Sequence, residues 1–294
     1  MKVLVTGSDG FIGKHVVNSL SQQGHEVRKF DLPSSIIKRE TCWLHVSGCD
    51  AIVHLAAATD RYAAEEDATN CMMTNVIGTQ RLLSAARLAG VKRVVAASSL
   101  RSLANAKGVV PLIEDSPVAP ASLFGASKLA MEGVLWDSPI STYILRLTTV
   151  YGPGGEAKGG LIARAFEAAR KSNSKPTLRG DGFAERKLDL VYVEDVVRAV
   201  GLALQDDRHD VIINVGFGRS HSMGHILNAV QTITGVPTET IWSEARRPNV
   251  PRVSIDRAKH LLGWEPRVDL IEGLRRTWEH LVGTQRQQPQ ALVA

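Results

Sequence analysis

Three glycines near the N-terminus constrain the fold of this chain more than any other feature. Gly7, Gly10 and Gly13 stand between the apolar run of residues 2–6, which predicts a buried strand, and residues 11–23, which predict a helix. In such a strand–turn–helix junction, the first glycine permits the tight turn, the second lets the backbone approach a pyrophosphate, and the third lets the helix pack against the strand. The helix N-terminus adds free N–H groups and a partial positive charge. The pattern therefore predicts a phosphate-binding turn, with a glycine-rich turn that holds no ligand as the alternative.

An acidic residue extends this predicted site. Residues 26–30 predict a second strand, and Asp31 follows it directly. A carboxylate at this place accepts hydrogen bonds from both hydroxyls of a ribose and repels a 2′-phosphate, so the sequence predicts NAD in preference to NADP. The predicted cofactor contacts in this part of the chain are Gly7, Asp9, Gly10, Phe11, Ile12, Gly13 and Asp31.

Strands and helices alternate through most of the chain, which predicts an α/β fold with a Rossmann-type doubly wound parallel sheet. Further strands are predicted at 51–55, 93–97, 142–147, 189–193 and 211–215, and further helices at 69–89, 122–137 and 194–205. We expect the strands at 189–193 and 211–215 to return to this sheet, after a less regular stretch that follows the glycine-rich turn at 151–155. The expected division is a NAD-binding domain (1–151 and 186–216), a smaller C-terminal α/β substrate lobe (152–185 and 217–283) and a flexible tail (284–294).

Composition excludes several classes of function. The net charge of +5 is modest and spread along the chain, so it fits an anionic small molecule at least as well as nucleic acid, and a merely solvated surface would also account for it. We expect an anionic small molecule and no nucleic acid as the partner. Charged and polar residues interrupt every apolar stretch before the roughly 18 residues that would suggest a membrane span, and no signal peptide is evident, so we expect a cytoplasmic protein. Cys42, Cys49 and Cys71 lack disulfide or metal-ligand spacing, so we expect buried apolar cysteines and no metal.

Further motifs follow the glycine turn in a fixed order. They are residues 54–57 (HLAA), 75–79 (NVIGT), 98–99 (SS), 128–132 (KLAME), 146–153 (RLTTVYGP), 180–182 (GDG), 191–195 (VYVED), 214–216 (NVG) and 262–266 (LGWEP). Nearly end to end, the chain resembles the extended short-chain dehydrogenases/reductases, the group that contains NAD-dependent nucleotide-sugar epimerases and dehydratases. The resemblance implies NAD as cofactor, a nucleotide sugar or related carbohydrate as substrate, and further cofactor contacts from Leu55, Ala56, Ala57, Asn75 and Lys128.

The resemblance also implies a homodimer, formed by helices 69–89 and 122–137 and their symmetry mates. Apolar side chains at helical spacing would serve this interface, although core packing would use them equally well. They are Met72, Val76, Leu83, Met131 and Leu135.

The same resemblance implies a catalytic set of serine or threonine, tyrosine and lysine, and here the chain departs from the family. In the family, tyrosine exchanges a proton with the substrate hydroxyl, and lysine lowers the pKa of the tyrosine and holds the nicotinamide ribose. Aligned on the Gly-Ala-Ser-Lys sequence that ends at Lys128, the tyrosine position holds Phe124, which has no proton to exchange. For the serine, counting back from Phe124 reaches Ser99, which we prefer, whereas alignment on the serine pair places Leu100 there.

Two more departures from the family concern the segment that borders the adenine and the arginines that bind the substrate phosphates. Between Asp31 and Asp50, the usual strand and helix that border the adenine have shrunk to a short stretch. The family's phosphate-binding arginine would stand at Leu188, but here Arg186 and Lys187 precede that position, and Arg247 lies in a second phosphate-contacting segment. We therefore predict Arg186 and Arg247 as substrate-binding residues.

Two classes of function follow. In the first, the chain is a NAD-dependent enzyme of nucleotide-sugar chemistry, in which Phe124 replaces the tyrosine of an active form or Ser99, Glu114, Tyr151 or a water handles the proton. In the second, it is a catalytically inactive NAD- or nucleotide-binding regulatory protein on the same scaffold, since a fold does not dictate a function. We prefer the enzyme.

Overall fold

A parallel sheet of six strands forms the centre of the protein. The computed structural model describes residues 1–31, 35–59, 66–103, 111–155, 160–171, 177–180, 184–242 and 252–286. The strands are β1 (Lys2–Thr6), β2 (Glu26–Phe30), β3 (Ala51–His54), β4 (Arg93–Ser99), β5 (Ser141–Leu147) and β9 (Val211–Val215), in the order β2-β1-β3-β4-β5-β9. The chain runs from β1 to β2 and then crosses to β3 on the other side of β1. This sheet confirms the predicted fold. Ligands of doubly wound sheets bind at such a switch point, outside the carboxyl ends of the strands.

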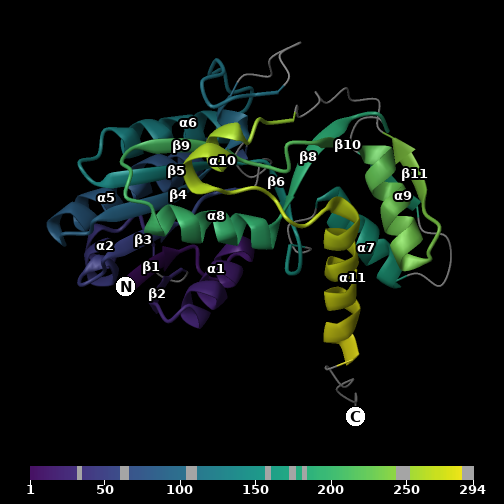
Figure 1. Ribbon diagram of the computed structural model, residues 1–294, viewed down its shortest axis with the longest axis horizontal. Coiled ribbons are helices and arrows are strands. Elements are labelled where there is room, and N and C mark those ends of the chain that lie inside the picture. The colour runs from purple at the N-terminus through teal and green to yellow at the C-terminus, as the bar shows by residue number, and fades with distance from the viewer. Residues whose placement is uncertain are drawn as a thin grey trace.

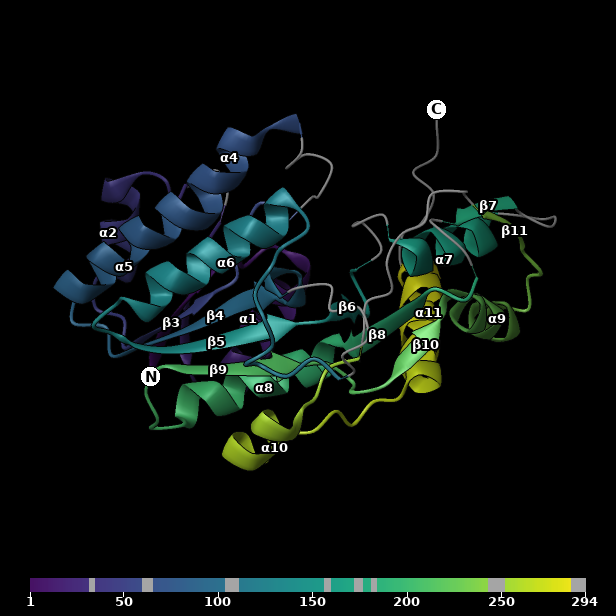
Figure 2. The ribbon, with the colours of Figure 1, turned by 90° about the horizontal axis from the view of Figure 1, so that it is seen from above.

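Helices cover both faces of this sheet (Figures 1 and 2). One face carries α1 (Phe11–Gln22) and α8 (Val193–Gln205), which pack against each other, and the other carries α2 (Arg39–Val46), α5 (Thr79–Leu88) and α6 (Leu123–Trp136). Alternate residues of β1 serve the two layers, because Val3 and Val5 belong to one core cluster and Leu4 to the other. Burial on both faces explains why the three central residues of the strand, Val3, Leu4 and Val5, are all apolar.

The predicted helix at 69–89 is continuous but not uniform. It consists of α4 (Ala68–Met72), a π-helical stretch η1 (Met73–Gly78) and α5. A Cβ atom on Gly78 would lie 2.6 Å from Cγ1 of Ile36, so only glycine lets this side chain pack against η1. The sequence did not predict the π-helix, a form that is rare and is frequent at functional sites.

The short segment between β2 and β3 folds back onto the edge of the sheet. Residues 35–50 hold α2 and no strand, so β2 is an edge strand in the described part of the chain. The Arg28 guanidinium donates to the carbonyls of His45 (2.9 Å) and Ser47 (2.7 Å) at the C-terminal end of α2. The rings of Phe30 and His45 stack with centroids 4.1 Å apart. These contacts hold α2 against the edge strand.

The strand expected at 189–193 does not return to the main sheet, and that prediction is wrong. Strand β8 (Lys187–Tyr192) lies between β6 (Thr149–Tyr151) and β10 (Ser220–Ser222) in a separate three-stranded sheet. The reason is that β6 follows β5 almost directly, leaves the main sheet and offers its own edge to β8, whereas β9 takes the place beside β5.

Beyond this second sheet lie α7 (Leu161–Lys171), β7 (Thr177–Gly180), α9 (Met223–Thr234), β11 (Glu239–Trp242) and α11 (Leu270–Arg286), with β7 parallel to β11 (Figure 1). Helix α10 (Asp256–Leu262) lies instead beside β9 and α8 of the main sheet. Helix α11 includes residues 284–286, so the tail expected from residue 284 starts too early; residues 287–294 lie outside the described part. Among the described residues, no helix is long and apolar enough to cross a membrane.

The motif at 262–266 fixes the C-terminal part of the chain against α8. Gly263 ends α10 in the left-handed conformation, with φ of 60°. The fully buried Trp264 donates from its indole nitrogen to the Asp195 carbonyl at 2.9 Å. The Asp195 carboxylate accepts from the backbone N–H groups of Arg267 (2.9 Å) and Val268 (3.1 Å).

Candidate active site

The glycine turn lies against the loop that follows β3. Gly7 has φ of 68°, and a Cβ atom there would lie 2.8 Å from the Ala56 nitrogen. A Cβ atom on Gly13 would lie 2.0 Å from the Gly7 carbonyl oxygen. The first turn of α1 has no side-chain cap, because its N-cap is Gly10. The Ser8 side chain is 1 % exposed, and its hydroxyl has no hydrogen-bond partner among the described residues. A phosphate-bearing cofactor fits this turn, since the turn has uncapped N–H groups and an unsatisfied hydroxyl.

Asp31 is fixed beside the same turn. The backbone N–H of Asp9 donates to its Oδ2 atom at 2.7 Å, which joins the end of β2 to the glycine turn. The predicted contacts Leu55, Ala56 and Ala57 lie in the neighbouring loop, at the carboxyl end of β3. The structure thus brings the N-terminal group of predicted NAD contacts to the switch point of the sheet.

His54 is a buried link in this region. Its Nδ1 lies 2.8 Å from the Thr6 hydroxyl and its Nε2 lies 2.8 Å from the Thr79 hydroxyl. Because the Thr79 hydroxyl donates to the Asn75 carbonyl at 2.7 Å, it accepts from Nε2–H, and Thr6 donates to Nδ1. Burial, followed by the positive charge of Lys128, lowers the pKa of His54 to about 3. The imidazole is therefore neutral and joins β1 to the start of α5.

Asn75 connects the loop after β3 to helix α6. The side chain is fully buried; its Oδ1 accepts from the Ala58 N–H at 2.8 Å, and its Nδ2 donates to the Ser127 hydroxyl at 2.9 Å. Ser127 in turn donates to the Phe124 carbonyl at 2.8 Å. Asn75 therefore supports the first turn of α6. The cofactor contact predicted for Asn75 stays a prediction.

Lys128 is buried at the carboxyl end of β4. Its Nζ donates to the Ala97 carbonyl at 2.9 Å, and the residue is 4 % exposed. Burial lowers the pKa of Lys128 to about 8, against the negative charge of Glu132, which raises it.

Phe124 and Ser99 lie at the same corner of the sheet. A Cβ atom on Gly125 would lie 2.2 Å from the Arg101 carbonyl oxygen, so the first turn of α6 touches the turn that follows β4. Phe124 and Ser99 are both partly buried, and the Ser99 hydroxyl accepts from the Arg101 N–H at 3.3 Å. Leu100, the alternative to Ser99, is 7 % exposed and packs in an apolar cluster.

A buried ion pair supports this corner, and the sequence analysis assigned it no role. Arg146 in β5 donates to Glu132 in α6 from Nε (3.0 Å) and from a terminal nitrogen (2.7 Å), and both side chains are 5 % exposed. Ser98 and Ser102 donate to the same carboxylate, on either side of Ser99. Glu132 and Arg146 both lie in motifs that the sequence analysis named, at 128–132 and 146–153, and this was the available signal.

Two other groups considered for the proton step have structural partners. The Tyr151 hydroxyl donates to the Asp269 carbonyl at 3.3 Å, and burial raises the pKa of Tyr151 well above its usual value. The Glu114 carboxylate accepts from the Asn214 N–H at 2.7 Å and lies 3.7 Å from Arg257.

Of the two arginines predicted to bind substrate, the structure describes only Arg186. Arg186 is 9 % exposed and directly precedes β8, and its carbonyl accepts from the Met223 N–H at 2.8 Å. Arg247 lies outside the described residues.

The three cysteines are free and buried, as expected. Among the described residues, no group of histidine, cysteine, aspartate and glutamate could hold a metal ion.

Known proteins with a similar sequence and fold agree with the resemblance. The UDP-glucose 4-epimerase of Mycolicibacterium smegmatis is 34 % identical over 315 residues, which cover 95 % of this chain and 98 % of the relative. The crystal structure of UDP-glucose 4-epimerase from Thermotoga maritima with UDP-glucose is 29 % identical, has a TM-score of 0.89 and covers 97 % of this chain and 100 % of its own. MoeE5 in complex with UDP-glucose and NAD is 30 % identical, with a TM-score of 0.88 and the same coverage.

The sequence model of the NAD dependent epimerase/dehydratase family matches residues 3–216, which contain the glycine turn, Asn75, Lys128 and Arg146. This chain belongs to the NAD dependent epimerase/dehydratase family.

Proposed function

We propose that this chain binds NAD and acts on a nucleotide sugar by hydride transfer, with acid–base chemistry that Phe124 impairs or alters. The observation that carries the proposal is the convergence of the uncapped glycine turn, Asp31 and the buried Lys128 at the carboxyl end of one sheet. Bound NAD would supply a hydride acceptor and donor. The chain's part would be to bind the phosphates at the turn, the adenosine ribose at Asp31 and the nicotinamide ribose at Lys128.

The substrate class is supported by the relatives. UDP-glucose accompanies two of the similar structures, and UDP-glucose 4-epimerase is the name of the Mycolicibacterium smegmatis relative. We propose residues 152–185 and 217–283 as the substrate lobe, with residues 1–151 and 186–216 as the NAD-binding domain. In that lobe, Arg247, together with Arg186 at the boundary, would bind the substrate phosphates as guanidinium donors.

Phe124 decides how fast such a reaction can run. A positioned acid or base contributes about 10² to 10⁴ in rate, and a phenyl ring supplies neither. Tyr151 and Glu114 have structural partners, which leaves Ser99 or a water as the proton carrier at this corner. The same observation favours the second candidate function, a catalytically inactive NAD- or nucleotide-binding regulatory protein.

Calorimetric titration with NAD⁺ tests whether the protein binds NAD, which both candidate functions require, or whether the glycine turn holds no ligand. The purified protein is first denatured and its released nucleotides are identified by mass spectrometry, because a bound cofactor would mask the titration. Bound or titratable NAD supports the proposal, and the absence of both contradicts it.

Turnover of UDP-glucose by the natural chain and by Phe124→Tyr then separates enzyme from binding protein. We expect slow turnover in the natural chain and an increase of at least about 100-fold in Phe124→Tyr. If NAD binds but neither protein transfers hydride with a panel of nucleotide sugars, the regulatory function becomes the better account.

A homodimer through helices 68–88 and 123–136 is also proposed. Of the apolar residues named for it, Leu83, Met131 and Leu135 are buried in the core, whereas Met72 and Val76 are partly exposed. Sedimentation equilibrium tests the dimer, and a monomer at micromolar concentration contradicts it. The cytoplasmic location stays a prediction.

A further inference from the structure

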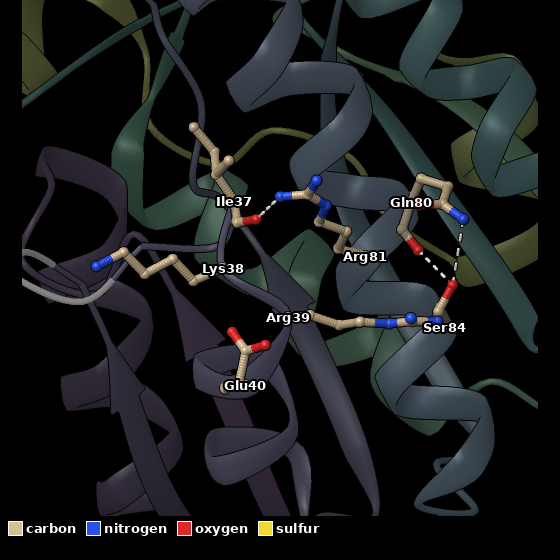
Figure 3. A pocket seen from close by; sticks show the side chains of 7 residues that line it. All are labelled: Ile37, Lys38, Arg39, Glu40, Gln80, Arg81 and Ser84. Atoms are coloured by element: carbon tan, nitrogen blue, oxygen red, sulfur yellow. Dashed lines mark hydrogen bonds between the residues drawn. The ribbon is translucent and has the colours of Figure 1, made fainter.

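A cavity of about 530 Å³ lies between α2 and α5. It is lined by the residues at the start of α2 and by one side of α5, and Figure 3 shows these side chains. They are Ile37, Lys38, Arg39, Glu40, Gln80, Arg81 and Ser84. None of them is among the residues that we propose for NAD or for the substrate.

The lining of the cavity is basic. Lys38, Arg39 and Arg81 carry positive charge, and Glu40 is the one acidic residue that lines it. Figure 3 shows that Arg39 extends across toward Ser84, and that Arg81 points toward the Ile37 carbonyl, to which it donates. Two guanidinium groups therefore border the space from different elements. Planar guanidinium groups are the side chains best matched to the oxygens of a phosphate.

The start of α2 adds to this positive potential. The N-cap of the helix is Lys38, whose side chain accepts no hydrogen bond from the first turn. An uncapped helix N-terminus carries free N–H donors and about half a positive charge. Ser84 contributes a hydroxyl, which donates to the Gln80 carbonyl at 2.9 Å and accepts from the Gln80 amide at 3.3 Å.

Packing around Ile36 connects the segment that precedes the cavity to the π-helix. Ile36 is 6 % exposed and lies against Gly78, and its carbonyl accepts from the Cys42 thiol at 3.1 Å. The cavity begins one residue later, at Ile37. The residues that line the cavity are different from those of the glycine turn.

We propose that this cavity binds a phosphate group, free or in a small phosphate monoester, independently of the NAD site. Arg39 and Arg81 hold the phosphate oxygens from two sides, and the N-terminus of α2 and Lys38 neutralise the remaining charge. The proposal does not rest on the proposed function, because it uses none of the residues assigned to NAD or substrate.

Calorimetric titration with inorganic phosphate and with glycerol 3-phosphate, at constant ionic strength, tests the proposal. We expect one phosphate per chain in this cavity, and binding that is weakened about tenfold in Arg39→Gln because one charge-assisted contact is lost. Arg39 is exposed, so this variant should fold normally. Lys38, which extends away from Arg39 in Figure 3, should matter less, with a change of at most about threefold in Lys38→Gln.

Arg87→Gln is the matched control, because Arg87 is an exposed arginine on α5 that does not line the cavity. It should bind phosphate as the natural chain does. Equal affinity for both probes identifies a site for the bare phosphate group, and tighter binding of glycerol 3-phosphate identifies a site for an ester. No binding, or binding that Arg39→Gln and Arg87→Gln change equally, overturns the proposal.

Discussion

Lys128 and Glu132 lie one helical turn apart on α6, and each is 4 % exposed. Burial lowers the pKa of Lys128, whereas the Glu132 carboxylate raises it, and the net result is a pKa of about 8. Arg146 in turn pairs with Glu132 and also donates to the Glu114 carbonyl at 2.7 Å. The charge state of Lys128 thus depends on an ion pair that joins α6 to β5.

The low pKa of Lys128 predicts a pH dependence of stability. The folded pKa of about 8 lies below the usual value of 10.5, so the unfolded chain binds more protons between these pH values. Stability from this group is fully present above pH 10.5 and is lost as the pH falls through 8. The free energy of unfolding of the natural chain, measured against Lys128→Met in urea, should rise by about 3 kcal/mol across this range. Parallel pH profiles of the two proteins would show that Lys128 titrates normally.

Removal of the Glu132 charge should destabilise the protein strongly. Glu132→Gln leaves the Arg146 guanidinium buried without a counter-charge, which costs about 3–5 kcal/mol in comparable buried pairs. Glu279→Gln is the control, because it breaks an exposed pair with Arg275 and should cost less than about 1 kcal/mol. Urea denaturation at pH 7 gives both values, and equal losses would mean that burial of the first pair has no energetic consequence.

Gly13→Ala should disrupt the glycine turn. The added Cβ atom would lie 2.0 Å from the Gly7 carbonyl oxygen, which is backbone and cannot move aside without opening the turn. We expect NAD affinity to fall by more than about tenfold, and stability to fall by about 1–3 kcal/mol. Gly201→Ala is the matched control within α8, where a Cβ atom meets nothing within 4 Å and alanine should stabilise the helix by up to about 1 kcal/mol. Unchanged NAD affinity in Gly13→Ala would place the cofactor elsewhere.

The parts of the fold that local sequence determines were predictable. The strand at residues 2–6, the glycine turn and the helix from residue 11 form one unit, in which apolar spacing and glycine positions act over a few residues. The same holds for α8, whose start and end match the expectation to within one residue. Signals for α9 were also present, because Ser222 caps its first turn and Gly235 ends it in the left-handed conformation, but they were not used.

What could not be predicted depends on partners that are distant in the chain. The sequence of β8 reads as a buried strand in either sheet, and only the departure of β6 from the main sheet decides where it pairs. The stacking of His45 on Phe30 and the capping of α2 by Arg28 join segments more than ten residues apart. In the site, the sequence placed Lys128 and Ser99 in a catalytic set by resemblance, but the bonds from Ser98 and Ser102 to Glu132 needed the structure.

Removal of the Tyr151 hydroxyl and removal of the Ser99 hydroxyl should affect turnover differently. Tyr151→Phe removes a hydroxyl that donates to the Asp269 carbonyl, so turnover of UDP-glucose should stay within about twofold. Ser99→Ala removes the hydroxyl that we propose as a proton carrier at the Phe124 corner, so turnover should fall at least about tenfold while NAD affinity stays unchanged. If the natural chain has no measurable turnover, the same pair is compared in the Phe124→Tyr protein. A large loss in Tyr151→Phe, with stability and NAD affinity intact, would instead make Tyr151 the proton carrier and would require its hydroxyl to leave the Asp269 carbonyl during the reaction.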